Sequence, residues 1–184
     1  SARFVKAKHT PVDIELQPGS LELSDKKFEI IELKGHSPDQ VGIVTEDNVL
    51  FCGDAFFSEE KMAKYPFPFV FDVREHLANL ESLMDTDYDY YVISHSDQLP
   101  KDPKVVIQKN VDNITENINL IINFLSQPYT REDLAELIIQ KYSIPMNVPQ
   151  YFITLTSVSA FLTYLLEEKA INMDIIDGKI YFYV

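Results

Sequence analysis

The stretch Phe28-Glu-Ile-Ile-Glu-Leu-Lys-Gly-His-Ser-Pro decides the fold of this 184-residue chain. Its first half alternates like a β-strand, and its second half is a turn that carries a histidine. Gly35 allows a tight turn at the strand end, and Pro38 fixes the direction in which the chain leaves it. The stretch therefore predicts a strand with His36 just beyond its end.

Two further apolar runs end in the same way. Val49–Cys52 leads through a glycine to Asp54, and Tyr90–Ile93 leads through a serine to His95. Imidazole nitrogens and carboxylate oxygens bind zinc, and one carboxylate can bridge two ions about 3.5–4 Å apart. Taken singly, each residue also fits an ordinary structural role, such as a helix cap. As a set, they lead us to expect His36, Asp54 and His95 at one edge of a sheet as metal ligands.

The remaining elements of the first half follow from local signals. We expect two hairpins, an irregular aromatic stretch with two prolines, and two amphipathic helices. The hairpins are 12–16 with 21–23, around a turn at 17–20, and 41–45 with 49–52. The aromatic stretch is 65–69, and the helices run from the expected N-cap Asp72 to about Met84 and over about 103–125. A Ser-His dyad at His95 is disfavoured because adjacent residues rarely face each other and no nucleophile-elbow pattern is present.

The character of the chain changes near residue 127. Thr130 is expected to cap a helix through Tyr142, and Pro149 to open another helix to about Lys169. The pair Asp177-Gly178 then predicts a two-residue hairpin turn. Helix, helix and hairpin is the order of a winged helix, so we predict two domains, 1–127 and 128–184.

Composition limits the class of protein. The single cysteine, Cys52, excludes an internal disulfide framework and is expected to be a small core residue. No apolar run approaches the roughly 20 residues that span a bilayer, and no signal peptide is recognisable. We therefore expect a cytoplasmic protein without membrane contact. The opening Ser1-Ala2 resembles a cloning remnant, which suggests a piece of a longer protein.

The net charge of −13 argues against nucleic-acid partners, because such a surface repels phosphate backbones. Residues 128–184 also carry more acidic than basic side chains, so we do not expect the winged helix to bind DNA. The alternative to an enzyme is a non-catalytic binding or interaction module. The other histidines, His9 and His76, are interpreted as incidental.

Together the three motifs resemble the second half of a metallo-β-lactamase-fold hydrolase. The similarity covers about residues 12–126, and residues 128–184 resemble the small winged-helix domain that ends many members. It implies an α/β (α+β) fold: half of an αβ/βα sandwich plus the small domain. It also implies that His36 completes the ligand set of one metal, that Asp54 bridges the two metals, and that His95 binds the second metal.

The same resemblance implies a hydrolase of a small-molecule substrate, with a hydroxide activated by two zinc, iron or manganese ions. The family's H-x-H-x-D-H ligands are absent from these residues, so we expect an incomplete site and an inactive fragment with no further catalytic residue assigned. Ser94 and Asp39 stand where the family usually has glycine, which affects loop shape. Half a sandwich leaves an apolar sheet face uncovered, so we expect a homo-oligomer.

Overall fold

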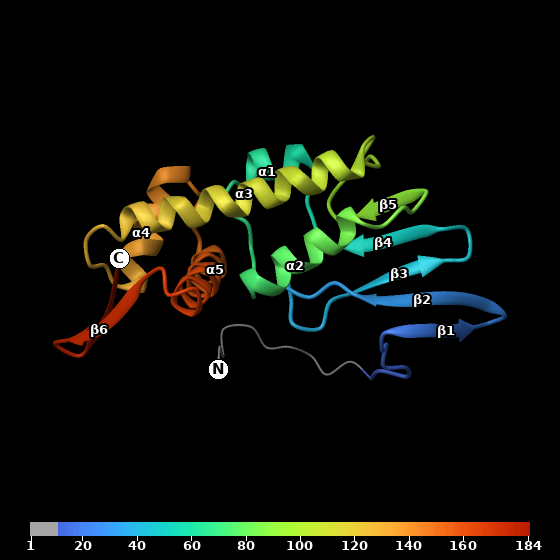
Figure 1. Cartoon of the computed structure of the whole chain (residues 1–184), viewed down its shortest axis with the longest axis horizontal. Coiled ribbons are helices and arrows are strands. Elements are labelled where there is room, and N and C mark those ends of the chain that lie inside the picture. Colours follow the sequence, from blue (N-terminus) through green and yellow to red (C-terminus); the bar gives the residue numbers. More distant parts are fainter. Residues whose placement is uncertain (1–10) are drawn as a thin grey trace.

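A five-stranded sheet occupies one end of the molecule and a group of helices the other (Figure 1). The computed structural model describes residues 11–184; His9 therefore lies outside the described residues. The sheet order is β1-β2-β3-β4-β5. The strands are β1 (Gly19–Leu23), β2 (Lys26–Glu32), β3 (Val41–Thr45), β4 (Val49–Gly53) and β5 (Tyr90–Ile93). Neighbours are antiparallel except β4 and β5, which are parallel.

The first hairpin differs from the prediction. Residues 12–16 form no strand, and β1 instead pairs with β2 through the two-residue turn Ser24-Asp25. Both turn residues have positive φ, 51° and 61°, which is the requirement of a type I′ hairpin turn. A turn was expected at residues 17–20 because proline and glycine are a stronger local turn signal than serine and aspartate. The structure shows that this expectation was wrong. The hairpin of β3 and β4 is confirmed.

In the part of the chain that the structure describes, five helices accompany the strands. They are α1 (Glu59–Lys64), α2 (Val73–Met84), α3 (Pro103–Phe124), α4 (Arg131–Tyr142) and α5 (Val148–Glu167). The caps predicted at Asp72 and Thr130 are confirmed, since each side chain accepts a hydrogen bond from a backbone N–H of the first turn. A second sheet, β6 (Asn172–Ile176) and β7 (Lys179–Tyr183), turns at Asp177-Gly178 as expected. Helix α1 was not predicted.

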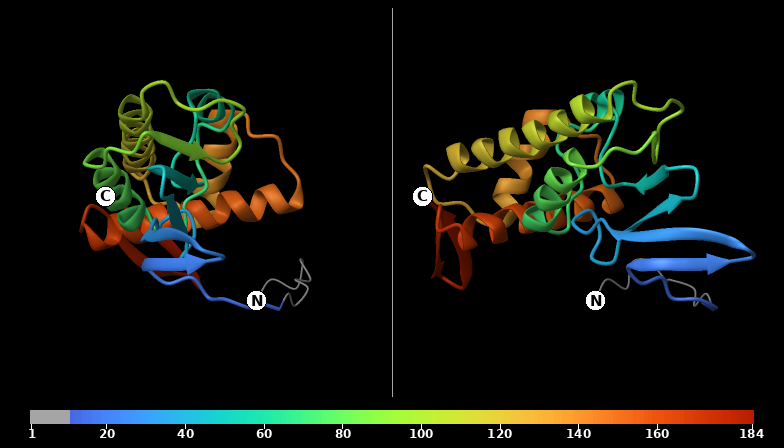
Figure 2. Two further views of the ribbon diagram at one scale, coloured as in Figure 1. Left: turned by 90° about the vertical axis from the view of Figure 1, so that its right-hand side faces the viewer. Right: turned by 45° about the vertical axis from the view of Figure 1, so that its right-hand side comes forward.

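The helices α2 and α3 cover one face of the five-stranded sheet (Figure 2). Val44, Leu50 and Cys52 point from that face into a cluster with Leu80 of α2 and Ile107 of α3. Cys52 is fully buried, and burial raises the pKa of its thiol to about 12. The cysteine is therefore a core side chain without nucleophilic character at neutral pH.

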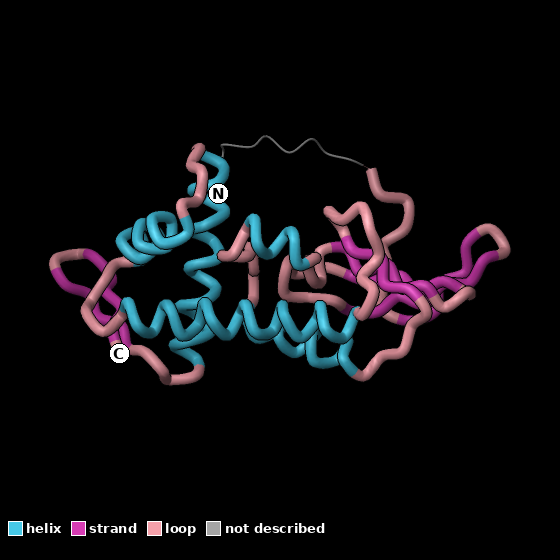
Figure 3. The backbone as a smooth tube through the Cα atoms, turned by 90° about the horizontal axis from the view of Figure 1, so that it is seen from above, coloured by secondary structure: helices cyan, strands magenta, loops and turns pink. Residues whose placement is uncertain are grey.

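A second hydrophobic cluster joins the two predicted domains. It combines Ile114 and Ile121 of α3 with Ile138 of α4 and Phe161 of α5. Because α3 runs from the sheet to these helices, it belongs to both clusters (Figure 3). Residues on the two sides of position 127 thus share one core. The domain boundary and the winged-helix assignment stay predictions.

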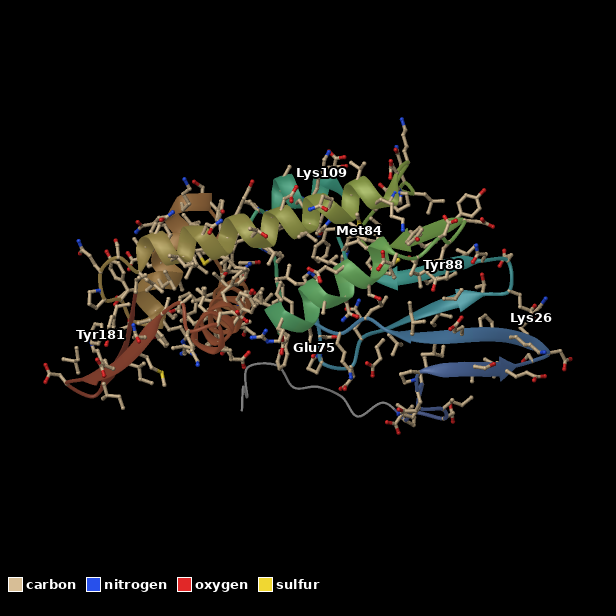
Figure 4. All side chains as sticks on the ribbon, in the orientation of Figure 1. Lys26, Glu75, Met84, Tyr88, Lys109 and Tyr181 are labelled. Carbon is tan, nitrogen blue, oxygen red and sulfur yellow. The ribbon has the colours of Figure 1, made fainter. Side chains whose placement is uncertain are left out.

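The far face of the sheet carries apolar side chains that neither cluster includes, within residues 11–184. The strand registers place Leu23, Phe51 and Tyr90 on this face, and they are 48, 46 and 55% exposed. Lys26 at the tip of the sheet and Tyr181 on the last hairpin mark the two ends of the elongated molecule (Figure 4). Within the described chain, none of the helices is sufficiently long and apolar to span a membrane. The cytoplasmic location stays a prediction.

Candidate metal centre

The structure brings His36, Asp54 and His95 together. Strands β2, β4 and β5 run in the same direction, so their carboxyl ends meet at one edge of the sheet. Each of the three residues follows one of these strands. His36 Nε2 lies 3.7 Å from Asp54 Oδ2, and His95 Nε2 lies 3.5 Å from Asp54 Oδ1. The carboxylate therefore stands between the two imidazoles and faces one with each oxygen.

The ring of His36 is held in a fixed orientation. Its Nδ1 lies 3.1 Å from the carbonyl oxygen of Phe69, and as a donor there it leaves the Nε2 lone pair facing Asp54. The rings of Phe57 and Phe69 approach it edge to face, at 5.8 and 5.0 Å between centroids. Burial lowers the pKa of His36, opposed by the carboxylate of Asp54. A neutral imidazole with an oriented free nitrogen is the form that binds a metal.

Asp54 is placed by a tight turn after β4. Gly53 has φ +57°, and the backbone N–H of Ala55 donates to the carbonyl of Cys52 at 3.1 Å. The side chain of Gln40 donates to the same carbonyl. Asp54 Oδ1 is buried and makes no hydrogen bond. A buried carboxylate oxygen without a hydrogen-bond donor is costly unless a cation compensates it.

His95 has the backbone conformation of a strained residue. Its φ is +59°, in the left-handed region that residues other than glycine seldom occupy. The N–H of Ser94 donates to the carbonyl of Gly53, which ties the loop after β5 to the loop after β4. The His95 side chain is 58% exposed. Strain of this kind persists at functional sites because the surrounding structure imposes it.

The three side chains do not form a complete site for one ion. Between residues 11 and 184, no three His, Cys, Asp or Glu side chains are arranged to hold one metal together. The arrangement offers two pairs instead, His36 with Asp54 and Asp54 with His95. Protein zinc sites generally use three or four ligands, so each pair needs further ligands.

Gly35 holds the loop that carries His36 against helix α2. Its carbonyl accepts hydrogen bonds from the N–H groups of Phe71 and Asp72, at 2.8 and 2.9 Å. A Cβ at Gly35 would lie 2.4 Å from both Cα and N of His76. His76 is 2% exposed, and burial lowers the pKa of its ring to about 4, so the ring is neutral at neutral pH. His76 therefore has a structural role that no local sequence signal revealed.

Two buried asparagines of α3 hold the chain that forms the aromatic side of the site. Asn110 Nδ2 donates to the carbonyl of Phe57 and Asn110 Oδ1 accepts from the N–H of Phe57, both at 2.9 Å. Asn117 Nδ2 donates to the carbonyl of Pro66 at 2.9 Å, and its Oδ1 accepts from the hydroxyl of Tyr142 on α4. The sequence shows Asn110 only as a polar break in an apolar helix face. Such a break is itself a signal of a buried hydrogen-bond partner.

A pocket of about 410 Å³ opens beside the three polar residues. Its floor includes His36, Asp54 and His95, and its walls are largely apolar. The apolar wall residues are Phe57, Met62, Tyr65, Phe67, Pro68, Phe69 and Ile153. An apolar pocket with a few convergent polar groups is the usual form of a small-molecule site.

Known proteins share part of this sequence and its architecture. A sequence profile of the metallo-beta-lactamase superfamily matches residues 3–95, which is just over half of the chain. Hydroxyacylglutathione hydrolase 1 from Vibrio vulnificus is 39% identical over 56 residues, covering 26% of this chain and 22% of that protein.

Two crystal structures share the fold over 95% of this chain. A metallo-beta-lactamase family protein from Thermus thermophilus aligns with a TM-score of 0.75 and 18% identity, and a beta-lactamase domain protein from Burkholderia ambifaria with 0.69 and 14%. The alignments cover 55 and 53% of those chains, so this chain spans about half their length. The expected α/β class is confirmed. The profile match, which runs through the three motifs, shows that the chain belongs to the metallo-beta-lactamase superfamily.

Proposed function

We propose that this chain carries half of the metal centre of a hydrolase that acts on a small molecule. His36 and Asp54 would hold one divalent ion, and Asp54 and His95 a second. The observation that carries the proposal is the Asp54 carboxylate, which lies between two imidazole nitrogens with one buried oxygen that makes no hydrogen bond. Membership of the superfamily and the partial similarity to a hydroxyacylglutathione hydrolase support the hydrolase class.

The residues fit divalent ions such as zinc, iron or manganese, because imidazole and carboxylate suit all three. Ions bound there supply Lewis-acid activation of water and of the attacked carbonyl or phosphoryl oxygen. The chain's own contributions are orientation and exclusion of water. Phe69 fixes the tautomer of His36, and the rings of Phe57 and Phe69 shield that imidazole from solvent.

The remaining ligands are proposed to come from polypeptide outside these 184 residues. The chain spans about half of the related structures, and the family's H-x-H-x-D-H stretch is absent from its sequence. Two ligands for each ion give weak binding that leaves much of the coordination shell to water. We therefore expect the 184-residue chain to lack catalytic activity, whereas the longer protein hydrolyses its substrate.

Zinc titration by isothermal calorimetry tests the ligand assignment. We expect weak, micromolar or poorer binding to the 184-residue chain, because each ion has only two ligands from it. Asp54→Asn removes the bridging charge and should weaken the binding by at least about tenfold. Asp39→Asn is the matched control, since it removes a carboxylate from the His36 loop without touching the three ligands.

Three results would contradict this proposal. Equal loss of affinity in the two variants would mean that zinc responds to net charge alone. Two tight sites per chain would mean that the ligand set is complete. No zinc binding at millimolar concentration would favour the alternative, a non-catalytic interaction module.

In the isolated 184-residue chain, we propose that a second copy covers the far face of the sheet. Phe51 lies on this face and is 46% exposed, and Tyr90 lies on the same face of the neighbouring strand β5. Sedimentation velocity at tens of micromolar should therefore show a dimer or larger species, and Phe51→Glu should shift it to monomer. Phe71→Glu is the control because Phe71 is equally exposed, at 50%, but lies outside the strands. A wild-type chain that sediments as a monomer contradicts the proposal.

A further inference from the structure

The pocket beside the candidate metal centre is bounded by elements far apart in sequence. The chain after β4 and helix α1 supply Phe57 and Met62, and Phe67 and Phe69 come from the aromatic segment before α2. The opposite side belongs to the first turns of α5, which contribute Gln150 and Ile153. The last proposed metal ligand, His95, precedes these α5 residues by more than fifty positions.

The walls of the pocket are held rigidly against each other. Asn110 fixes the backbone of Phe57, and Asn117 fixes that of Pro66. The backbone N–H of Val70 donates to the hydroxyl of Ser157 on α5, 3.3 Å away. The rings of Phe67 and Phe161 pack at 5.3 Å between centroids. The aromatic segment and α5 therefore keep their spacing without a ligand, and the pocket is preformed.

The open face of the pocket ends at two half-exposed side chains. Tyr65 is 40% exposed and Ile153 is 42% exposed, whereas Phe57 and Phe67 are 9 and 8% exposed. An apolar ligand that reaches Ile153 removes this apolar surface from water, which is favourable in proportion to the area covered. A polar ligand would gain little, because among the described residues that line the pocket only Gln150 and Lys61 add an amide or a charge to the three proposed ligands.

We infer that this pocket binds an apolar, ring-sized part of the substrate, next to the bond that is hydrolysed, and that Ile153 is a specificity-determining residue. The inference rests on the proposed function, because the hydrolysed bond is placed at His36, Asp54 and His95. It assigns a role to α5: the helix forms the wall that selects the apolar group. The substrate is accordingly one that carries an aromatic or compact aliphatic group beside the hydrolysed bond.

The test uses two neutral amides that differ by one ring, benzamide and acetamide. Binding to the ¹⁵N-labelled 184-residue chain is followed by NMR without metal. Benzamide should bind at least about tenfold more tightly than acetamide, since burial of a ring contributes more than the roughly 1.4 kcal/mol that corresponds to tenfold. Shifted signals should include Met62, Phe69 and Ile153.

Ile153→Glu should weaken benzamide binding by about tenfold or more, because it places a charge in the apolar wall. Ile175→Glu makes the same change at an exposed position of β6, 76% accessible and remote from the pocket, and should leave binding unchanged. Equal affinity for the two amides, or equal affinity of wild type and Ile153→Glu, would overturn the inference.

The same measurement separates this inference from the metal proposal. Ile153→Ala is expected to weaken benzamide binding but to leave zinc binding within about twofold, because it removes apolar wall surface and Ile153 is not one of the three proposed ligands. Benzamide binding without zinc binding would leave the pocket assigned and remove the metal centre. Zinc binding without benzamide binding would support the metal centre and overturn the assignment of the pocket.

Discussion

Replacement of Gly35 by alanine is expected to destabilise the protein by about 2–6 kcal/mol and to abolish zinc binding. Gly35 has φ +121°, and a side chain in such a conformation costs about 1–3 kcal/mol. The new Cβ would also lie 2.4 Å from backbone atoms of His76, and relief of such overlap costs about 1–3 kcal/mol more. Because the neighbouring atoms are backbone of α2, the loop must move, and His36 moves with it. Urea unfolding and zinc calorimetry measure the two effects.

Gly19→Ala is a close control for this prediction. Gly19 has φ +123°, nearly the angle of Gly35, but no atom lies within 4 Å of the Cβ that it would gain. Gly19→Ala should therefore lose only the conformational part, about 1–3 kcal/mol, and keep its zinc affinity. If both variants unfold at the same urea concentration, the contact of the new Cβ with His76 contributes nothing to the loss of stability.

Asn110→Leu is the second large effect, with an expected loss of about 2–6 kcal/mol. Leucine has a similar size but leaves both the N–H and the carbonyl of Phe57 without their partner in a buried position. Each unpaired buried group costs about 1–3 kcal/mol. The segment after β4 should loosen as well, which hydrogen exchange at Phe57 would report as faster exchange. Unfolding in urea gives the stability loss.

Asn113→Leu provides the comparison on the same helix. Asn113 also donates to the carbonyl of Pro66, at 3.0 Å, but Asn117 donates to that same oxygen. The carbonyl therefore keeps a partner, and the loss should stay below about 1 kcal/mol. A loss as large as that of Asn110→Leu would show that asparagine is needed along this helix for reasons other than the Phe57 hydrogen bonds.

Elements with strong local signals were predicted correctly from the sequence. Asp72 and Thr130 cap their helices, and Asp177-Gly178 forms the last hairpin turn, because capping and type I′ geometry depend on a few adjacent residues. The expected closeness of His36, Asp54 and His95 followed from their positions after strands. Strand ends that face the same way gather side chains at one edge of a sheet.

Features that depend on distant contacts could not be predicted from the sequence. The Ser24-Asp25 turn contains no glycine, although both residues have positive φ, so a stronger turn signal nearby was preferred. His76 and Asn110 have roles set by Gly35 and Phe57, which lie 41 and 53 positions away. The pocket wall on α5 is likewise set by packing across the shared core.

The parallel pairing of β4 and β5 has a consequence for how the site is assembled. Strands β1 to β4 each pair with the next strand in sequence, and their longest connection is residues 33–40, so His36 and Asp54 can meet early through local pairing of neighbouring segments. β5 reaches its place only after residues 54–89, which include α1 and α2, have closed a long loop. We therefore expect His95 to join last, so that an ion bound before β5 is paired would have only one histidine and one carboxylate of this chain available.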